Sequence, residues 1–158
     1  MGFRIISLGE YMKTITLGEK FVNRKFDFRE TCFGICERNG LILLTKHKNE
    51  IAMVGGGIEK GETHEDCLRR EFLEESGYTI ESINELCVVD CCWLAGGQWP
   101  MESLANFYVV NLSEEADNPT ENGYEPVWVP IDEVENILPL PYHKEGIRQY
   151  FAMKKQIN

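Results

Sequence analysis

The chain has 158 residues, of which 27% are charged, and a formal net charge of -10. This length is ordinary for one domain with its own hydrophobic core, so we predict a single domain over residues 1–158. The negative charge argues against long nucleic acid or an anionic membrane as partner, because both need a basic protein surface. It does not exclude a phosphorylated small molecule.

The first part of the chain, residues 1–30, is predicted to be an N-terminal extension that precedes a core at residues 31–155. Phe3–Ser7 and Lys13–Leu17 could form short strands, and the charged stretch Asn23–Glu30 is expected to be a connection. The N-terminus lacks the apolar core of a signal peptide, and no stretch approaches the length of a membrane span. We therefore expect a cytoplasmic protein.

Three short strands are predicted next. Thr31–Glu37 and Leu41–Lys46 are apolar runs on either side of Asn39-Gly40, and Asn-Gly between such runs is a strong hairpin signal. Ile51–Val54 leads into the glycines at 55–57. Consecutive glycines allow a sharp turn and a close approach of the backbone to a ligand.

A helix is predicted from His64 to Ser76 by signals at both ends. Thr63 is a plausible N-cap, and Asp66 stands in the capping-box position three residues later. Gly77 can supply the left-handed residue that ends a helix.

The remaining chain alternates apolar runs with turn signals. Leu86–Leu94, Ser103–Leu112 and Pro126–Val129 are predicted strands, a loop is predicted at 96–100, and helices are predicted at Asp132–Leu138 and His143–Lys155. Strands interleaved with about three helices indicate an α/β fold with a mixed sheet and helices on both faces.

Four charged side chains share one face of the helix at 64–76. Arg70, Glu71, Glu74 and Glu75 are three or four residues apart, which places them within an arc of about 140°. Leu68 and Phe72 lie beside that arc and should face the core. One arginine cannot neutralise three carboxylates, whereas Mg²⁺ or Mn²⁺, which prefer carboxylate ligands, can. The alternative is an acidic face exposed to solvent.

The spacing of residues 56–78 is more specific than charge alone. It reads G-x5-E-x7-R-E-U-x-E-E-x-G-U, where U is a bulky apolar residue, with the fixed positions Gly56, Glu62, Arg70, Glu71, Phe72, Glu74, Glu75, Gly77 and Tyr78. This stretch resembles the complete Nudix box, so the chain looks like a Nudix (MutT-like) hydrolase. The resemblance implies a Nudix-type α/β/α sandwich with a central mixed β-sheet.

The resemblance also implies a reaction. Nudix enzymes use a divalent metal to hydrolyse a pyrophosphate bond in a nucleoside diphosphate linked to another moiety, here a nucleoside triphosphate or a nucleotide-sugar type of molecule. The expected cofactor is Mg²⁺ or Mn²⁺, and the expected partner is a small nucleotide. In this family an N-terminal extension often serves dimerisation or substrate contacts, so residues 1–30 suggest a homodimer.

Site roles are carried over by position. Glu71, Glu74, Glu75 and Gly56 correspond to the metal-binding set, and Glu71, Glu74 and Arg70 to the catalytic set. Arg70 and Glu62 match positions that orient the carboxylates. Which glutamate accepts the proton from water stays open, because the family varies in this respect.

Candidate substrate-binding residues, of which Glu62 alone lies in the box, complete the list. They are Glu62, Glu121, Glu125, Trp99 and His143. Glu121 and Glu125 could add a carboxylate from a late loop or could simply be solvated. Trp93, Trp99, Phe107 and Tyr142 could stack on a base, although packing is the more common role of such residues. His143 is expected to be an exposed residue near a helix start rather than a catalytic base.

Two alternatives to a nucleotide pyrophosphohydrolase remain. One is a non-catalytic nucleotide-binding or sensor module on the same fold, and the other is a hydrolase of capped RNA ends, which the negative charge disfavours. The six cysteines are expected to be reduced structural thiols. Cys67 falls inside the carboxylate arc, where it either packs beneath the metal site or is sensitive to oxidation.

Overall fold

The computed structural model describes residues 12–21 and 23–157. It contains nine strands and three helices in this order: β1 (Lys13–Leu17), β2 (Asp27–Ile35), β3 (Glu37–Arg38), β4 (Leu41–His47), β5 (Glu50–Met53), β6 (Gly55–Gly57), α1 (His64–Ser76), β7 (Ile80–Ala95), β8 (Trp99–Leu112), β9 (Tyr124–Pro130), α2 (Val134–Ile137) and α3 (Pro141–Ile157). The strand expected at Phe3–Ser7 lies outside the described residues.

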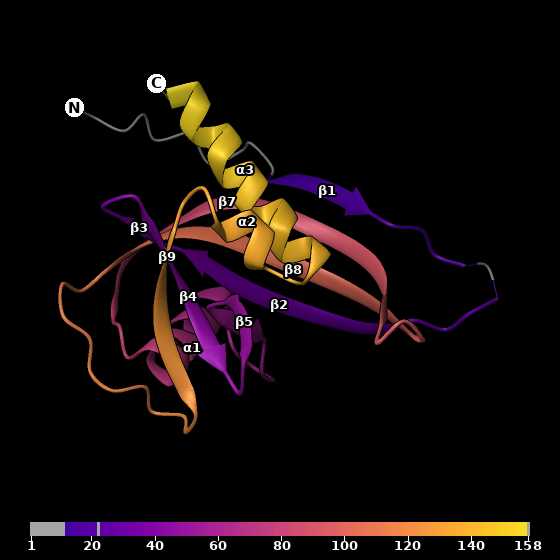
Figure 1. Ribbon diagram of the computed structural model, residues 1–158. Helices are drawn as coiled ribbons and strands as arrows, with labels where there is room; N and C mark the ends of the chain where they lie inside the picture. The colour runs from indigo at the N-terminus through magenta and orange to yellow at the C-terminus, as the bar shows by residue number, and fades with distance from the viewer. Residues whose placement is uncertain (1–11, 22, 158) are drawn as a thin grey trace.

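The main sheet is mixed, as predicted. Its five strands lie in the order β1-β7-β8-β2-β6, with β1–β7 and β2–β8 parallel and β7–β8 and β2–β6 antiparallel. A second sheet joins β3, β4 and β5, and β9 pairs with β4 (Figure 1). The three-glycine strand β6 therefore forms one edge of the main sheet.

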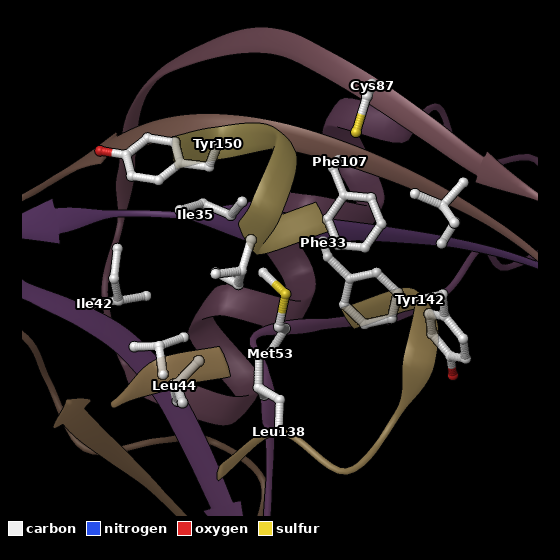
Figure 2. Packing of buried hydrophobic residues seen from close by; sticks show 14 of the residues in the cluster. Phe33, Ile35, Ile42, Leu44, Met53, Cys87, Phe107, Leu138, Tyr142 and Tyr150 are labelled. Carbon is white, nitrogen blue, oxygen red and sulfur yellow. The ribbon is translucent and has the colours of Figure 1, made fainter. Parts of the chain in front are cut away.

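The two long helices, α1 and α3, cover opposite faces of the main sheet. Alternate residues of β2 point to opposite sides of the sheet, and those on each side pack against a different helix. Phe33 and Ile35 pack in one hydrophobic cluster with residues of α3, and Figure 2 shows this core around Phe33, Phe107 and Met53. The even-numbered Cys32 and Cys36 pack in a second cluster with Leu68 and Phe72 of α1. Leu68 and Phe72 are fully buried, which confirms that they face the core.

Helix α1 has the predicted bounds because its end signals operate locally. The Thr63 hydroxyl accepts a hydrogen bond from the Asp66 N–H at 3.1 Å, and the Asp66 carboxylate accepts one from the Thr63 N–H at 3.1 Å. Gly77 ends the helix in the left-handed conformation, with φ of 76°. A Cβ at that position would clash with the backbone carbonyl of Asp117, so the loop before β9 packs closely against the helix end.

Several strands are longer than predicted. The stretch Asn23–Glu30 is only partly a connection, because β2 begins at Asp27 and pairs from there with β8. Strand β7 begins at Ile80 and β8 at Trp99, since the antiparallel ladder runs from Ile80–Leu112 to Ala95–Trp99. The polar residues at the start of β7 and in the predicted loop 96–100 did not predict strands. Backbone hydrogen bonds nevertheless pair these segments, because such bonds do not depend on the side chains.

Helix α3 begins at Pro141, two residues earlier than predicted, and proline is well suited to a first helical turn. A Cβ at Gly146 would clash with the Phe107 ring, so the helix lies directly on β8. Farther along, the Tyr150 hydroxyl and the Lys154 ammonium each reach the Glu37 carboxylate at 2.6 Å. These contacts hold the second half of α3 against β3. None of the described helices is both long and apolar enough to span a membrane.

Candidate active site

A cavity of about 710 Å³ opens where α1 and the glycine strand β6 meet. Six acids line it: Glu71, Glu74 and Glu75 from α1, Glu121 from the loop before β9, Glu50 from β5 and Glu59 from the loop before α1. Arg70 lines the same wall, and the opposite wall carries residues of β2 and α3, namely Arg29, Thr31, Phe33, Tyr142 and His143. The cavity therefore lies between the predicted acidic face of α1 and two further elements, β2 and α3.

Arg70 holds the acidic helix face and the glycine turn together. Its guanidinium donates to both carboxylate oxygens of Glu62 at 2.5 and 2.9 Å, to Glu71 at 2.8 Å and to Glu74 at 3.2 Å. It also donates to the Gly57 carbonyl at 3.0 Å. The hydrogen bonds from Arg70 lower the pKa of Glu62 to about 2. Glu62 lies outside the cavity lining, so its contact with this site runs through Arg70.

Glu75 stands apart from this network. It is buried, and among the described residues no lysine or arginine forms an ion pair with it. Burial raises its pKa to about 10, and the hydrogen bond and charge of the neighbouring Glu71 act in the same direction. Burial and the charge of Glu71 also raise the pKa of Glu74. Without a cation, the protonated forms of Glu75 and Glu74 are therefore favoured, because Arg70 alone does not offset the charge of three neighbouring carboxylates.

These donors fit a hard divalent cation. The side chains that converge on this wall offer carboxylate oxygens, the ligand type that Mg²⁺ and Mn²⁺ prefer. Gly56 lies so close that a Cβ there would be 2.5 Å from Glu71 Oε1. The backbone therefore reaches the acids only because residue 56 has no side chain. Glu71, Glu74, Glu75 and Glu121 are the candidate ligands for such a cation, because they line the cavity beside Gly56.

Cys67 packs beneath the glycine turn. Its side chain is fully buried, and its thiol lies 3.6 Å from both the Gly56 and the Gly57 carbonyl oxygens. This position agrees with the packing role that the sequence suggested for it.

The other predicted residues are divided between cavity and surface. Glu121 lines the cavity, and its N–H donates to the Glu74 carbonyl at 3.1 Å, which ties the late loop to the end of α1. Glu125 is exposed and pairs with Lys46 at 3.7 Å. The indole of Trp99 is exposed and donates to Asp27 at 2.7 Å, outside the cavity lining. Of the aromatic candidates, Tyr142 alone is among the residues that line the cavity.

The expectation that His143 is exposed was wrong. Only 2% of the residue is accessible, and it lines the cavity. Because α3 starts early and lies on the sheet, its first turn places the imidazole edge-on to Phe33 and Tyr142, with ring centroids 4.4 and 4.7 Å apart. This packing depends on contacts between distant segments, which the local sequence does not reveal.

Sequence reasoning also missed two residues of the cavity wall. Arg29 and Thr31 line it together with Phe33, on the same face of β2. Their spacing of two residues was the available signal, but Arg29 fell in a stretch assigned to a connection.

In the described part of the chain, ligand atoms of three residues lie within 4.8 Å of one another at Asp90, Cys92 and Glu102, whereas the cavity acids are spaced more widely. This second acidic group lies on β7 and β8, outside the cavity, and Lys20 already places its ammonium 2.8 Å from Glu102. Lysine therefore supplies positive charge to this group.

A mixed sheet with an acidic helix beside a glycine turn is the arrangement of a hydrolase that acts on phosphoric anhydrides. The NUDIX domain model matches residues 29–152, so the chain belongs to the Nudix hydrolase family. It is therefore a pyrophosphohydrolase that acts, in the general manner of the family, on derivatives of nucleoside diphosphates.

Solved structures agree with this assignment. A NUDIX hydrolase from Nitrosomonas europaea superposes with a TM-score of 0.68 at 20% identity, over 80% of this chain and 90% of that one. A MutT NUDIX hydrolase from Burkholderia pseudomallei gives 0.61 at 28% identity, over 78% and 98%. A protein described as an ADP compounds hydrolase gives 0.64 at 17% identity, over 82% and 75%. Among curated proteins no match was found.

Replacing Arg70 should lower the stability of the protein as well as disturb the arrangement of the site. Arg70→Gln removes the cation shared by Glu62, Glu71 and Glu74, so we expect the free energy of unfolding to fall by about 1–3 kcal/mol at neutral pH. Because Arg70 lowers the pKa of Glu62, the stability that this pair adds is present above about pH 4.5 and is lost as the pH falls toward 2. Urea unfolding of both proteins across this range tests it, and a difference independent of pH would contradict the role of Glu62.

Proposed function

We propose that this protein hydrolyses a pyrophosphate bond in a nucleoside triphosphate or a nucleotide-sugar type of diphosphate, using Mg²⁺ or Mn²⁺. Glu71, Glu74 and Glu75, with the Gly56 backbone, would hold the metal, and Glu121 would add a carboxylate from the late loop. The observation that carries this proposal is Glu75: a buried acid beside other acids, with no basic ion-pair partner in the described part of the chain.

The chain itself contributes charge and orientation. When bound, the metal neutralises phosphate charge and lowers the pKa of an attacking water. A glutamate beside that water, Glu71 or Glu74, would accept its proton. Arg70 keeps both carboxylates in place through its hydrogen bonds at 2.8 and 3.2 Å. Arg29 of β2, which lines the same cavity, would offer its guanidinium to a phosphate of the substrate.

The wider setting follows the same proposal. The substrate is a small nucleotide rather than long nucleic acid, in keeping with the net charge of -10. We place the protein in the cytoplasm as a single domain, and we propose that residues 1–30 serve a homodimer. Glu62 would act through Arg70, whereas Glu125 and Trp99, which lie outside the cavity lining, carry no role in this scheme.

A hydrolysis panel with product identification tests the reaction. Nucleoside triphosphates, nucleotide sugars and other nucleoside diphosphate derivatives are incubated with Mg²⁺, with Mn²⁺ or with EDTA. We expect cleavage of a pyrophosphate bond in at least one class, with phosphorylated products on both sides of the cut, and no turnover in EDTA. Turnover that persists in EDTA, or nucleotide binding with no product after long incubation, would contradict the proposal.

A further inference from the structure

Two buried polar side chains of the cavity wall lack hydrogen-bond partners. They are Thr31, through its hydroxyl oxygen, and His143, through both ring nitrogens; no partner for these atoms occurs within residues 12–21 and 23–157. Buried polar groups in native proteins are almost always paired, so unpaired ones call for an explanation. Both residues line the cavity that also contains the box glutamates. A ligand in that cavity can supply the missing partners.

The surroundings of these two groups are aromatic and firmly held. His143 meets the Phe33 ring edge-on at 4.4 Å and the Tyr142 ring at 4.7 Å, and the last two rings are 6.1 Å apart. Figure 2 shows the rings of Phe33 and Tyr142 next to each other. Gly146 allows α3 to lie directly against Phe107, which fixes the position of its first turn. The imidazole therefore cannot turn away to find another partner.

The His143 imidazole and the Thr31 hydroxyl are both uncharged hydrogen-bonding groups. Burial lowers the pKa of His143 to about 3, so the ring is uncharged at neutral pH and presents one N–H donor and one nitrogen acceptor. The Thr31 hydroxyl likewise both donates and accepts. Thr31 and His143 offer no positive charge to an anionic group, which Arg29 on the same face of β2 would attract instead, and a polyol would find few polar partners. A flat, uncharged ring with donors and acceptors on its edge matches both the hydrogen-bonding groups and the aromatic rings beside them.

We propose that Thr31 and His143 form a subsite that hydrogen-bonds the edge of the substrate's nucleobase, beside the rings of Phe33 and Tyr142. This subsite rests on the proposed function for the reaction it serves, while its binding role can be measured without any turnover. Arg29 extends from the same face of β2 and marks the direction of the phosphates.

Binding measurements in EDTA distinguish the affinity due to the base from the affinity due to the sugar and phosphate. Calorimetry is performed with four nucleoside monophosphates and with ribose 5-phosphate, which lacks a base. We expect the wild-type protein to bind one nucleotide more tightly than ribose 5-phosphate. Thr31→Val and His143→Leu should each weaken that nucleotide on the order of tenfold and leave ribose 5-phosphate unchanged. His143→Gln, which keeps a donor and an acceptor, should recover part of the loss.

Thermal unfolding without ligand shows whether the two residues serve structure instead. Thr31→Val and His143→Leu remove unsatisfied atoms, so both proteins should be at least as stable as the wild type. Thr45→Val is the matched control. Thr45 is as buried as Thr31 and lines the same cavity, but its hydroxyl donates to the Glu75 carbonyl at 3.2 Å. That variant should lose stability and keep the base preference.

The outcomes separate this subsite from the reaction. The subsite is overturned if no nucleotide binds better than ribose 5-phosphate, if the variants weaken both ligands equally, or if they lose as much stability as Thr45→Val. A base-dependent loss of binding in a protein that cleaves nothing would sustain the subsite and reject the proposed function.

Discussion

Glu75→Gln is expected to lower kcat by about 10²- to 10⁴-fold on whichever diphosphate the protein cleaves. The amide keeps the size of the side chain but removes the negative charge that would bind a cation at the buried end of the acidic wall. Steady-state kinetics with saturating Mg²⁺ measure the loss. Glu81→Gln is the control, because Glu81 is an exposed acid on β7 outside the cavity and its replacement should leave kcat unchanged. Equal activity of the two variants would remove Glu75 from the site.

The same substitution should stabilise the metal-free protein. Burial raises the pKa of Glu75 from an ordinary value of 4.5 to about 10, so folding favours its protonated form. The wild type is then expected to lose stability as the pH rises from about 4.5 toward 10, while Glu75→Gln lacks this loss. Thermal unfolding in EDTA at pH 5 and pH 8 checks the sign. If stability changed equally with pH in the two proteins, the surroundings of Glu75 would not favour its protonated form.

Gly56→Ala is expected to lower kcat on the order of 10²-fold, because it displaces Glu71, a carboxylate that we propose takes part in the reaction. A Cβ at residue 56 would lie 2.5 Å from Glu71 Oε1. Glu71 is buried and held by Arg70 at 2.8 Å, so it cannot yield without leaving its place on the cavity wall. The measurement is kcat at saturating metal, with circular dichroism to show that the fold is intact.

Gly57→Ala is the matched control for that variant. The added methyl group would meet the end of the Arg29 side chain at 3.0 Å, and this side chain is exposed and can move aside. Its kcat should fall much less than that of Gly56→Ala, and the displacement of Arg29, which we propose binds phosphate, should instead raise KM. If the two alanine variants behave alike, the close approach at residue 56 is not the cause.

Local signals explain what the sequence predicted well. Helix α1 has its predicted bounds because Thr63, Asp66 and Gly77 act within one turn of its ends. The acidic face needed only the helical repeat, which brings Glu71, Glu74 and Glu75 to one side. Strand β1, at Lys13–Leu17, was also correct.

Long-range packing explains what was missed. The extra length of β2 and β7 comes from pairing with β8, a partner distant in sequence from β2. His143 is buried because α3 crosses the sheet, and nothing in Pro141-Tyr142-His143 indicates that crossing. Arg29 and Thr31 became cavity residues only once β2 was known to begin at Asp27.

The two-sided packing of β2 has a consequence for how this enzyme can change. Thr31 faces the wall where we place the base, whereas its neighbour Cys32 faces the helix that carries the acids. Exchanges at Thr31 and His143 can therefore alter substrate choice without disturbing the packing of the acidic helix. A mutant library restricted to these two positions should yield new selectivities on an unchanged hydrolytic apparatus.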